Sequence, residues 1–385
     1  MKTHEVTYLA FSCFFGLCIG VCVYVLAEYV FSERSIEWNG GIYTGETRNE
    51  VPDGDGRFEK GGMTYSGKWT AGRLERGKVE SRKYVYEGEL MNFMFNGYGV
   101  CRYKDGSTYW GYWKQDKKDG LGHMEQKGRL TVNRYKDGIA LIPPGQRFRG
   151  GERVYGIDVS VHQGTICWQD VFLSCNRDGG VDGKMPKDRP YMQPVVFAIA
   201  KSTQGSRKRD RTFLRNMEWI RRCGICFGAY HFLTLNASGK RQAWNYIRNT
   251  RLQAGDMPPV LDLEKNTSEK PVVTDEEFKR IIPIAREWID VVERHYGVTP
   301  VLYTNMDVYE KIVSKDVVLA KCPLWIANPG TQRPDLKNCV IWQFSHHGKV
   351  NGVKDNVADI NMFYGDMKAF RDFLAEYGIK TSKQK

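Results

Sequence analysis

The feature that most constrains the fold is a short motif that recurs at nearly constant spacing in the first third of the chain. Tyr-x-Gly segments begin, at steps of 22, 21 and 23 residues, at Tyr43, Tyr65, Tyr86 and Tyr109. Between them lie glycine pairs at 54 and 56, 97 and 99, and 120 and 122, with Gly77 as a degenerate equivalent. Glycine turns that alternate with short aromatic strands at such a period indicate one β-hairpin per repeat. We therefore predict an all-β array of hairpins stacked into an extended, curved sheet.

The pattern changes completely after residue 153, where short apolar runs alternate with amphipathic helical stretches. Eight runs have the length of strands: 155–158, 195–201, 227–231, 260–264, 301–304, 324–327, 340–344 and 358–361. A helix is clear over 275–296, whereas the connections shorten after the fifth run, so the last strands are expected to lack full helices. This alternation predicts an α/β fold with a single (β/α) barrel. The polar segment 176–193 is expected to be a surface insertion.

The N-terminal segment is apolar enough to enter a bilayer. Residues 8–30 are almost uncharged until Glu28, which gives about 20 apolar positions, the length of a membrane-spanning helix. Lys2 precedes this segment and Glu33 follows it, which favours a cytoplasmic N-terminus and a C-terminal bulk outside. The alternative is a signal peptide cleaved after Val25-Leu-Ala27. We therefore expect a single-pass protein of the cell membrane or, alternatively, a secreted protein.

These patterns divide the chain into five segments. They are an anchor or signal over 1–34, the repeat array over 40–137, a linker over 138–153, the barrel over 154–378 and a tail over 379–385. The linker is assigned because its Pro, Gly and Arg residues break any period.

The net charge and the cysteines limit the partners and cofactors. A formal charge of +12 indicates an anionic partner, and an anionic cell-wall polymer or a membrane surface fits. No helix-turn-helix, zinc-finger or RNP pattern is present, so nucleic acid is not expected. Cys223 and Cys226 have redox-motif spacing, but a strand-like run follows them, so we favour buried thiols or an incidental disulfide. No second Cys-x-x-Cys completes a zinc site, and His346-His347 has no partner at ligand spacing; no metal or cofactor is expected.

Polar residues end nearly every run of the predicted barrel. They are Asp158, Lys201, His231, Asp262 with Glu264, Tyr303, Gln343 and Asp359. Chemistry in such barrels collects at the C-terminal ends of the strands. Several acids that converge on one mouth are a stronger signal than any single strand end, because caps and turns also favour Asp.

The pair Asp262 and Glu264 is the strongest catalytic candidate. At positions i and i+2 of a strand the two side chains point to the same face, and their alpha carbons lie roughly 6–7 Å apart. Two acids this close cannot both ionise easily, so the pKa of one rises and that group can act as a general acid. Glycoside hydrolysis needs one proton donor and one negative charge at the scissile bond. The preceding Pro258-Pro-Val-Leu indicates a buried strand, where carboxylates without partners are costly.

Two resemblances follow from these segments. Residues 41–125 resemble MORN repeats, which are associated with membranes, protein partners or simple spacing. The barrel region resembles glycoside hydrolase family 25, the lysozyme-like muramidases, and its motifs occur in family order. The motifs are Tyr155-Gly-Ile-Asp-Val-Ser-Val-His-Gln-Gly164, Phe197-Ala-Ile-Ala-Lys-Ser-Thr-Gln-Gly205, Gly228-Ala-Tyr-His-Phe232, Pro259-Val-Leu-Asp-Leu-Glu264, Leu324-Trp-Ile-Ala327, Trp342-Gln-Phe344 and Ala358-Asp-Ile-Asn361.

The family resemblance implies roles by position. Glu264 matches the general acid/base, and Asp262 matches its partner, either a nucleophile or the group that steers the substrate's N-acetyl oxygen. Asp158 and Asp359 match two further acids of the cleft. The implied sugar contacts are Tyr230, Tyr303, Trp325, Gln343 and Lys201. His231 is expected to orient its neighbours rather than to act in catalysis. Many members carry Thr-Glu-Gly where this chain has Thr203-Gln-Gly205, which loses one charge near the cleft and puts a subsite contact in doubt.

The expected function is hydrolysis of the β-1,4 bond between N-acetylmuramic acid and N-acetylglucosamine in peptidoglycan, with retention and without a metal. One alternative is a chitin-like glycan, although the signature of family-18 chitinases, Asp-x-x-Asp-x-Asp-x-Glu, is absent upstream of Glu264. The other is a non-catalytic cell-wall or membrane scaffold that uses the MORN repeats for protein or lipid contacts. The retained acids at 158, 262, 264 and 359 speak against the scaffold.

Overall fold

The computed structural model describes residues 34–141, 153–176, 180–181, 191–265, 274–330 and 332–380. All but the last residue of the predicted anchor or signal, most of the predicted linker and the last five residues lie outside this part of the chain. Among the described residues no helix is both long and apolar enough to cross a membrane. The described residues divide into two compact units, which separate within β8: one covers 34–108 together with 112–118, and the other covers 109–111 and the described residues from 119 onward.

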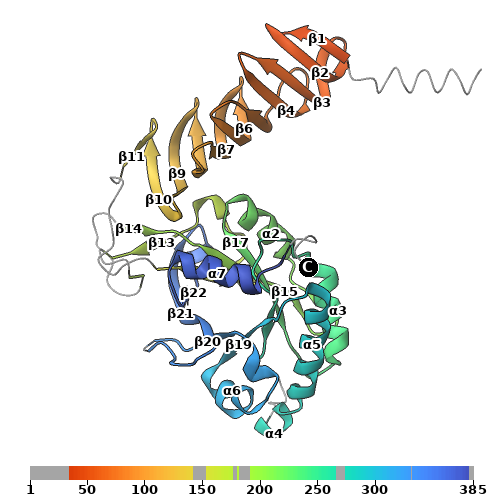
Figure 1. The fold of residues 1–385 in the computed structure, drawn as a ribbon, viewed down its shortest axis with the longest axis vertical. Helices are drawn as coiled ribbons and strands as arrows, with labels where there is room; N and C mark the ends of the chain where they lie inside the picture. The colour runs from red at the N-terminus through yellow and green to blue at the C-terminus, as the bar shows by residue number, and fades with distance from the viewer. Residues whose placement is uncertain are drawn as a thin grey trace, which may run out of the picture. The chain divides into compact units, whose positions relative to one another are not determined.

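The repeat region forms one sheet in which every strand pairs with the next along the chain, as Figure 1 shows in red to yellow. All the register pairs given for it are antiparallel. The strands are β1 (Arg34–Trp38), β2 (Gly41–Arg48), β3 (Val51–Lys60), β4 (Met63–Trp69), β5 (Arg76–Glu80), β6 (Tyr84–Met91), β7 (Met94–Tyr103), β8 (Thr108–Lys114), β9 (Lys117–Gln126), β10 (Arg129–Lys136) and β11 (Ile139–Ala140). The predicted all-β array is therefore confirmed: the region is one large antiparallel sheet of consecutive strands.

The repeated Tyr and Gly residues explain this sheet physically. Gly88 and Gly99 face each other across β6 and β7, and the ring of Tyr86 lies over both of them. A Cβ on either glycine would overlap that ring, so only glycine allows the tyrosine to lie flat on the backbone. The Tyr86 hydroxyl then donates to the Glu89 carbonyl at 2.8 Å. Tyr43 repeats the arrangement across β2 and β3, where it too is fully buried.

The barrel consists of eight strands, drawn from green to blue in Figure 1. They are β12 (Tyr155–Val159), β15 (Phe197–Gln204), β17 (Cys226–Phe232), β18 (Val260–Asp262), β19 (Val301–Asn305), β20 (Leu324–Ala327), β21 (Cys339–Asn351) and β22 (Val357–Phe363). The first seven run parallel, whereas β22 is antiparallel to both β21 and β12 and closes the circle. Each of the eight predicted runs corresponds to one strand. The reversal of β22 was not predicted, and it follows from the short link 352–356, because a parallel crossover needs a dozen residues or more.

Helices cover the first part of the barrel and become sparse after β19, as predicted. They are α2 (Phe213–Arg222), α3 (Gly239–Thr250), α4 (Asp275–Phe278), α5 (Ile281–Tyr296), α6 (Met306–Lys311) and α7 (Met367–Tyr377), with single 3₁₀ turns at Val161–Gln163, Trp168–Asp170, Val313–Lys315, Leu319–Lys321 and Lys354–Asn356. The predicted helix over 275–296 is interrupted between α4 and α5. Pro283 explains the break. In a continuous helix its ring would clash with the carbonyl of the residue four positions earlier, and its nitrogen has no hydrogen to donate to that carbonyl.

Three further strands were not predicted. β13 (Phe172–Cys175) and β14 (Tyr191–Gln193) form a hairpin on the extension of β21, and β16 (Lys208–Arg209) pairs with the end of β15. Cys223 caps the end of α2 and Cys226 is the first residue of β17; both are free thiols, and the motif runs into a strand as expected. The barrel core contains, among others, Phe197, Val260, Val301, Trp325 and Ile341, all nearly or completely buried.

Candidate active site

Two of the predicted acids meet directly across neighbouring strands. Asp158 in β12 and Asp359 in β22 are register partners. Because β22 runs antiparallel, Asp359 lies near the start of its strand yet at the same mouth as the C-terminal ends of the parallel strands. Both carboxyls are sheltered: Asp158 is 8% exposed and the Asp359 side chain is 29% exposed.

The other two acids lie at the end of β18. The strand ends at Asp262, so the prediction that Glu264 lies on the strand is wrong by two residues. The extended pairing nevertheless continues, because the Leu263 amide donates to the Tyr303 carbonyl at 2.9 Å. Leu263 is fully buried between the two acids, Asp262 is 5% exposed and Glu264 is half-buried. The Oδ1 atom of Asp262 is buried and has no hydrogen-bond partner among the described residues.

A hydrogen-bond network fixes Asp158 from two strands. The Gln343 amide donates to its Oδ2 at 2.8 Å, and the Asn361 amide donates to the same oxygen at 2.9 Å. Each amide is oriented in turn: the Tyr303 hydroxyl donates to Gln343 Oε1 at 2.9 Å, and the Trp325 indole donates to Asn361 Oδ1 at 2.8 Å. Both amides are therefore held with their N–H groups directed at the carboxylate.

This network changes the reading of two predicted sugar contacts. Trp325 and Gln343 are each only 1% exposed, and their polar atoms bond within the network. Tyr230, Tyr303 and Lys201 are half-buried. Asn361 is completely buried and donates to Asp158, but no role in the site was predicted for it from the sequence. The signal was present in the segment Ala358-Asp-Ile-Asn361, where Asn361 stands two residues after Asp359.

Burial and mutual repulsion raise the pKa values of all four acids. Burial and the charge of Asp359 raise the pKa of Asp158 well above its ordinary value, against the lowering effect of the Asn361 and Gln343 amides. Burial raises the pKa of Asp359 to about 6. Burial and the charge of Glu264 raise the pKa of Asp262, and burial raises that of Glu264. The four carboxyls therefore retain protons at a pH where isolated acids have lost them.

Of the cations around Asp262 and Glu264, Lys201 has the strongest effect on their pKa values. Its positive charge lowers the pKa of Asp262 and of Glu264, which opposes the effect of burial. Its ammonium donates to Gln204 Oε1 at 3.1 Å and lies 4.7 Å from the centroid of the Phe232 ring. The segment Thr203-Gln-Gly205 therefore supplies a neutral oxygen to this lysine.

The two histidines of this region differ. His231 is completely buried, contacts Thr203 Oγ1 through Nδ1 at 2.7 Å and stacks on Trp288. Burial lowers its pKa to about 3, so the ring is neutral at ordinary pH and supports its neighbours, as its expected role requires. His346 is exposed, and its Nδ1 lies 3.2 Å from Asp359 Oδ1.

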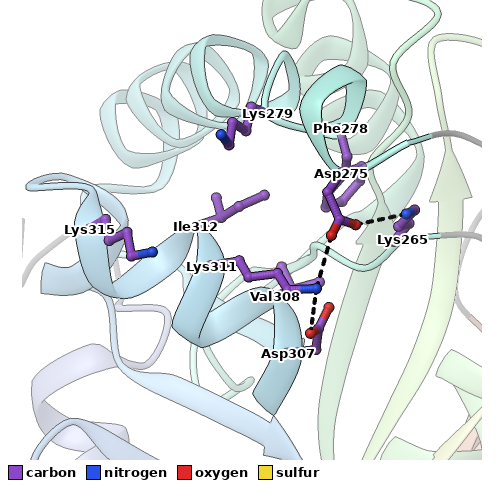
Figure 2. A pocket seen from close by; sticks show the side chains of 9 residues that line it. All are labelled: Lys265, Asp275, Phe278, Lys279, Asp307, Val308, Lys311, Ile312 and Lys315. Atoms are coloured by element: carbon purple, nitrogen blue, oxygen red, sulfur yellow. Dashed lines mark hydrogen bonds and ion pairs between the residues drawn. The ribbon is translucent and has the colours of Figure 1, made fainter.

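A pocket beside α4 and α6 is separate from these acids (Figure 2). It is lined by Lys265, Asp275, Phe278, Lys279, Asp307, Val308, Lys311, Ile312 and Lys315. Asp275 accepts ion pairs from Lys265 and Lys311, and Asp307 pairs with Lys311. Much of the lysine charge is thus neutralised within the pocket. In the part of the chain that the structure describes, no group of three or more His, Cys, Asp or Glu side chains has a metal-binding arrangement.

The matches to known proteins fall on the barrel region of the chain. Residues 157–353 match the family described as glycosyl hydrolases family 25. Lysozyme M1 of Streptomyces globisporus is 31% identical over 225 residues, which are 55% of this chain and 68% of that protein. The uncharacterised protein YegX of Escherichia coli K12 is 30% identical over 231 residues, 60% of this chain and 75% of its own. The crystal structure of the lysozyme from Streptomyces coelicolor is 28% identical, with a TM-score of 0.48, and covers 58% of this chain and 97% of that one.

The match to the family extends over more than half of the chain and includes three of the four clustered acids, Asp158, Asp262 and Glu264. The lysozyme relative is similar over most of its own length. The chain therefore belongs to glycosyl hydrolases family 25 and is a glycoside hydrolase of the lysozyme type.

Proposed function

We propose that this enzyme is a muramidase that hydrolyses the β-1,4 bond between N-acetylmuramic acid and N-acetylglucosamine in peptidoglycan, with retention of configuration and without a metal ion. The observation that carries the proposal is the pair Asp262 and Glu264, two sheltered acids with raised pKa values at a barrel mouth. Two close carboxyls that titrate together hold one proton between them, which gives one acid and one anion. Membership of a family that contains lysozymes supports the choice of substrate.

Glu264 is the proton donor in this proposal. It is the less buried member of the pair, and it lies just beyond the end of β18, so it is the member more open to a substrate. Its raised pKa keeps the proton on Glu264 to a higher pH than an isolated glutamic acid would retain it. After the bond breaks, the Glu264 carboxylate takes a proton from the attacking water and returns to its starting state.

Asp262 carries the negative charge that faces the oxocarbenium-like transition state. Its buried Oδ1 lacks a partner among the described residues. It is therefore free to accept a hydrogen bond from a substrate N–H or to stabilise an electron-poor carbon. The acetamido N–H of the substrate is one such donor, which favours the role in which Asp262 steers the N-acetyl group. Attack by Asp262 as a nucleophile is the alternative within the same retaining scheme.

The remaining site residues divide by burial. We assign a supporting role to Asp158 and Asp359, which are register partners on β12 and β22. Their charges contribute to the electrostatic potential at the mouth of the barrel. Tyr230 and Tyr303 are the proposed sugar contacts, because they are half-buried and interact electrostatically with the acids. Trp325 and Gln343, which are buried in the network, hold Asp158 rather than the sugar.

We propose that the hairpin array is a MORN array over 40–137 that acts as a spacer, joined by the linker 138–153 to the barrel 154–378. The repeated Tyr and Gly positions support the assignment. The apolar residues 8–30 support export, either as a membrane-anchored or as a secreted enzyme. N-terminal sequencing of the exported protein separates the two: an intact N-terminus supports the anchor, and a new one after Ala27 supports the signal peptide.

The product of digestion tests the proposed function. Purified peptidoglycan is digested with the full chain, the new reducing ends are reduced with borohydride, and the sugars are identified. We expect reduced N-acetylmuramic acid, initial release of the β-anomer by NMR, and unchanged rates in excess EDTA. Reduced N-acetylglucosamine, or activity on chitin alone, contradicts the substrate assignment. An absence of any reducing ends from several wall preparations favours a scaffold.

A further inference from the structure

The charge distribution around the paired acids presents a problem that the pair cannot solve alone. Asp262 is more deeply buried than Glu264, and the charge of Glu264 further disfavours the ionisation of Asp262. The repulsion between the two carboxylates acts on both members alike, so the deeper burial of Asp262 decides the balance and favours the shared proton on Asp262. The proposed reaction requires the opposite arrangement, with the proton on Glu264 and the charge on Asp262. A nearby cation that acts more strongly on Asp262 than on Glu264 is therefore needed.

Lys201 has the required position. Gln204 of β15, Phe232 of β17 and Asp262 of β18 are successive register partners across the sheet. The Lys201 ammonium bonds to the first of these side chains and lies over the second, which places it on the row of residues that leads to Asp262. The charge of Asp262 is the strongest of the influences that favour the protonated ammonium, ahead of Asp210 and Glu264, while burial opposes protonation. The ring of Phe232, with its centroid 4.7 Å from Nζ, stabilises a cation at this place.

The partner of Lys201 matters as much as its position. Its ammonium donates to the side-chain oxygen of Gln204 at 3.1 Å. A neutral amide orients the ammonium without neutralising it, so the full positive charge acts on the acids. A carboxylate at this position would satisfy the same hydrogen bond, yet it would cancel most of that field.

We propose that Lys201 is a positioning residue that, oriented by the neutral amide of Gln204, holds the negative charge on Asp262 and the proton on Glu264. The inference rests on the proposed function of the pair. It replaces the expected role of Lys201 as a sugar contact, and it makes Gln204 a determinant of the pH at which the enzyme works.

The other charged groups around the site do not supply the same field. Asp158, Tyr230 and Tyr303 face the pair from β12, β17 and β19, and none of these groups is cationic. His346 on β21 lowers the pKa of Glu264, while its ring bonds to Asp359. Around Lys201 itself lie Asp210, the buried and neutral His231, and the exposed Lys208 of β16.

The test is the pH profile of kcat and KM on peptidoglycan for four variants of the full chain. Lys201→Met removes the charge, Lys201→Arg retains it, Gln204→Glu neutralises it in place, and Lys279→Met is a control on exposed α4–α5 surface. Loss of the cation raises the pKa of both acids, so the profile of Lys201→Met should move to higher pH by on the order of one unit. Gln204→Glu should move it in the same direction by less. Lys201→Arg and Lys279→Met should keep the wild-type profile.

Two results overturn the inference while leaving the proposed function intact. One is a Lys201→Met profile that overlays that of the wild type while KM rises, which marks a sugar contact. The other is an unchanged profile for Gln204→Glu, a variant that retains the hydrogen bond and so is expected to fold. A readout independent of turnover is the titration of the Asp262 carboxyl carbon by ¹³C NMR, assigned with Asp262→Asn. Its midpoint should rise in Lys201→Met, and an unchanged midpoint contradicts the inference even if the enzyme shows no activity on peptidoglycan.

Discussion

At the scale of single residues, the mouth of the barrel holds four carboxyl groups where burial opposes their ionisation. Asp158 is fixed by two amide donors, whereas Asp262 has a buried oxygen without a partner among the described residues. Such groups lower the stability of the folded state at neutral pH, because the unfolded chain ionises them freely. A site of this kind is retained for chemistry, and its replacement should stabilise the fold.

Asp359→Asn tests this trade-off. The folded-state pKa of Asp359 is about 6, above the ordinary value near 3.9, so its contribution to stability is fully present below about pH 4 and is lost as the pH rises through 6. The stability of the variant relative to wild type should therefore increase by about 1–3 kcal/mol between pH 4 and pH 7.5. Urea unfolding of the barrel at both pH values measures it. The exposed Asp372→Asn is the control, and an equal difference at both pH values would disagree with this account.

Trp325→Phe tests the network behind Asp158. The variant removes the indole donor and leaves Asn361 Oδ1 without a partner in a buried place, which should cost about 1–3 kcal/mol of stability. The freed amide no longer has a fixed orientation, so kcat should fall at least several-fold with little change in KM. Trp342→Phe is the control for the loss of an indole donor, because the half-buried Trp342 donates to the Asn328 carbonyl outside the network. If both variants lower kcat equally, the network has no special role.

The acids of the site could be predicted from the sequence, whereas the network around them could not. Asp158, Asp262 and Glu264 follow from strand ends and spacing, since side-chain alternation is a local property. The partnership of Asn361 with Asp158 depends on the direction of β22, and an apolar run of strand length does not specify direction. The burial of Trp325 and Gln343 depends on neighbours from β19 and β22 that periodicity alone does not place.

At the scale of elements, local sequence rules explain both successes and errors. The eight runs of the barrel were recognisable because each is short, apolar and bounded by polar residues. β13 was missed because it is short and directly precedes the polar segment 176–193, and β14 was missed because it forms the last three residues of that segment, where the strand signal is weak. The break between α4 and α5 is encoded by Pro283, although amphipathic periodicity continues across it.

Gly56→Ala tests the explanation of the hairpin array. A Cβ at this position would overlap the ring of Tyr43, which must move or expose itself. We expect a loss of about 1–3 kcal/mol in the unfolding of the array, measured by thermal or urea unfolding of the full chain. Gly61→Asn is the control, since that position is open and asparagine tolerates its left-handed backbone. A tolerated Gly56→Ala would show that the ring does not require the glycine.

At the scale of the whole molecule, the chain combines a repetitive sheet with a catalytic barrel. The sheet and the barrel have different kinds of core: tyrosine rings packed over glycines in the sheet, and a closed ring of apolar strands in the barrel. The positive net charge of +12 suits an anionic wall polymer, and this agreement supports the proposed substrate without depending on the acids. The catalytic claim itself depends on a single side chain.

The most direct measurement of that claim is the rate at which N-acetylmuramic acid reducing ends appear from peptidoglycan, for the wild type, Glu264→Gln and Glu276→Gln. Glu276 is an exposed glutamate on α4 and matches the change in charge. The account predicts that Glu264→Gln loses at least about 100-fold in kcat, because general acid catalysis contributes roughly that much or more. Glu276→Gln should retain the wild-type rate. A Glu264→Gln enzyme that keeps its activity would contradict the account.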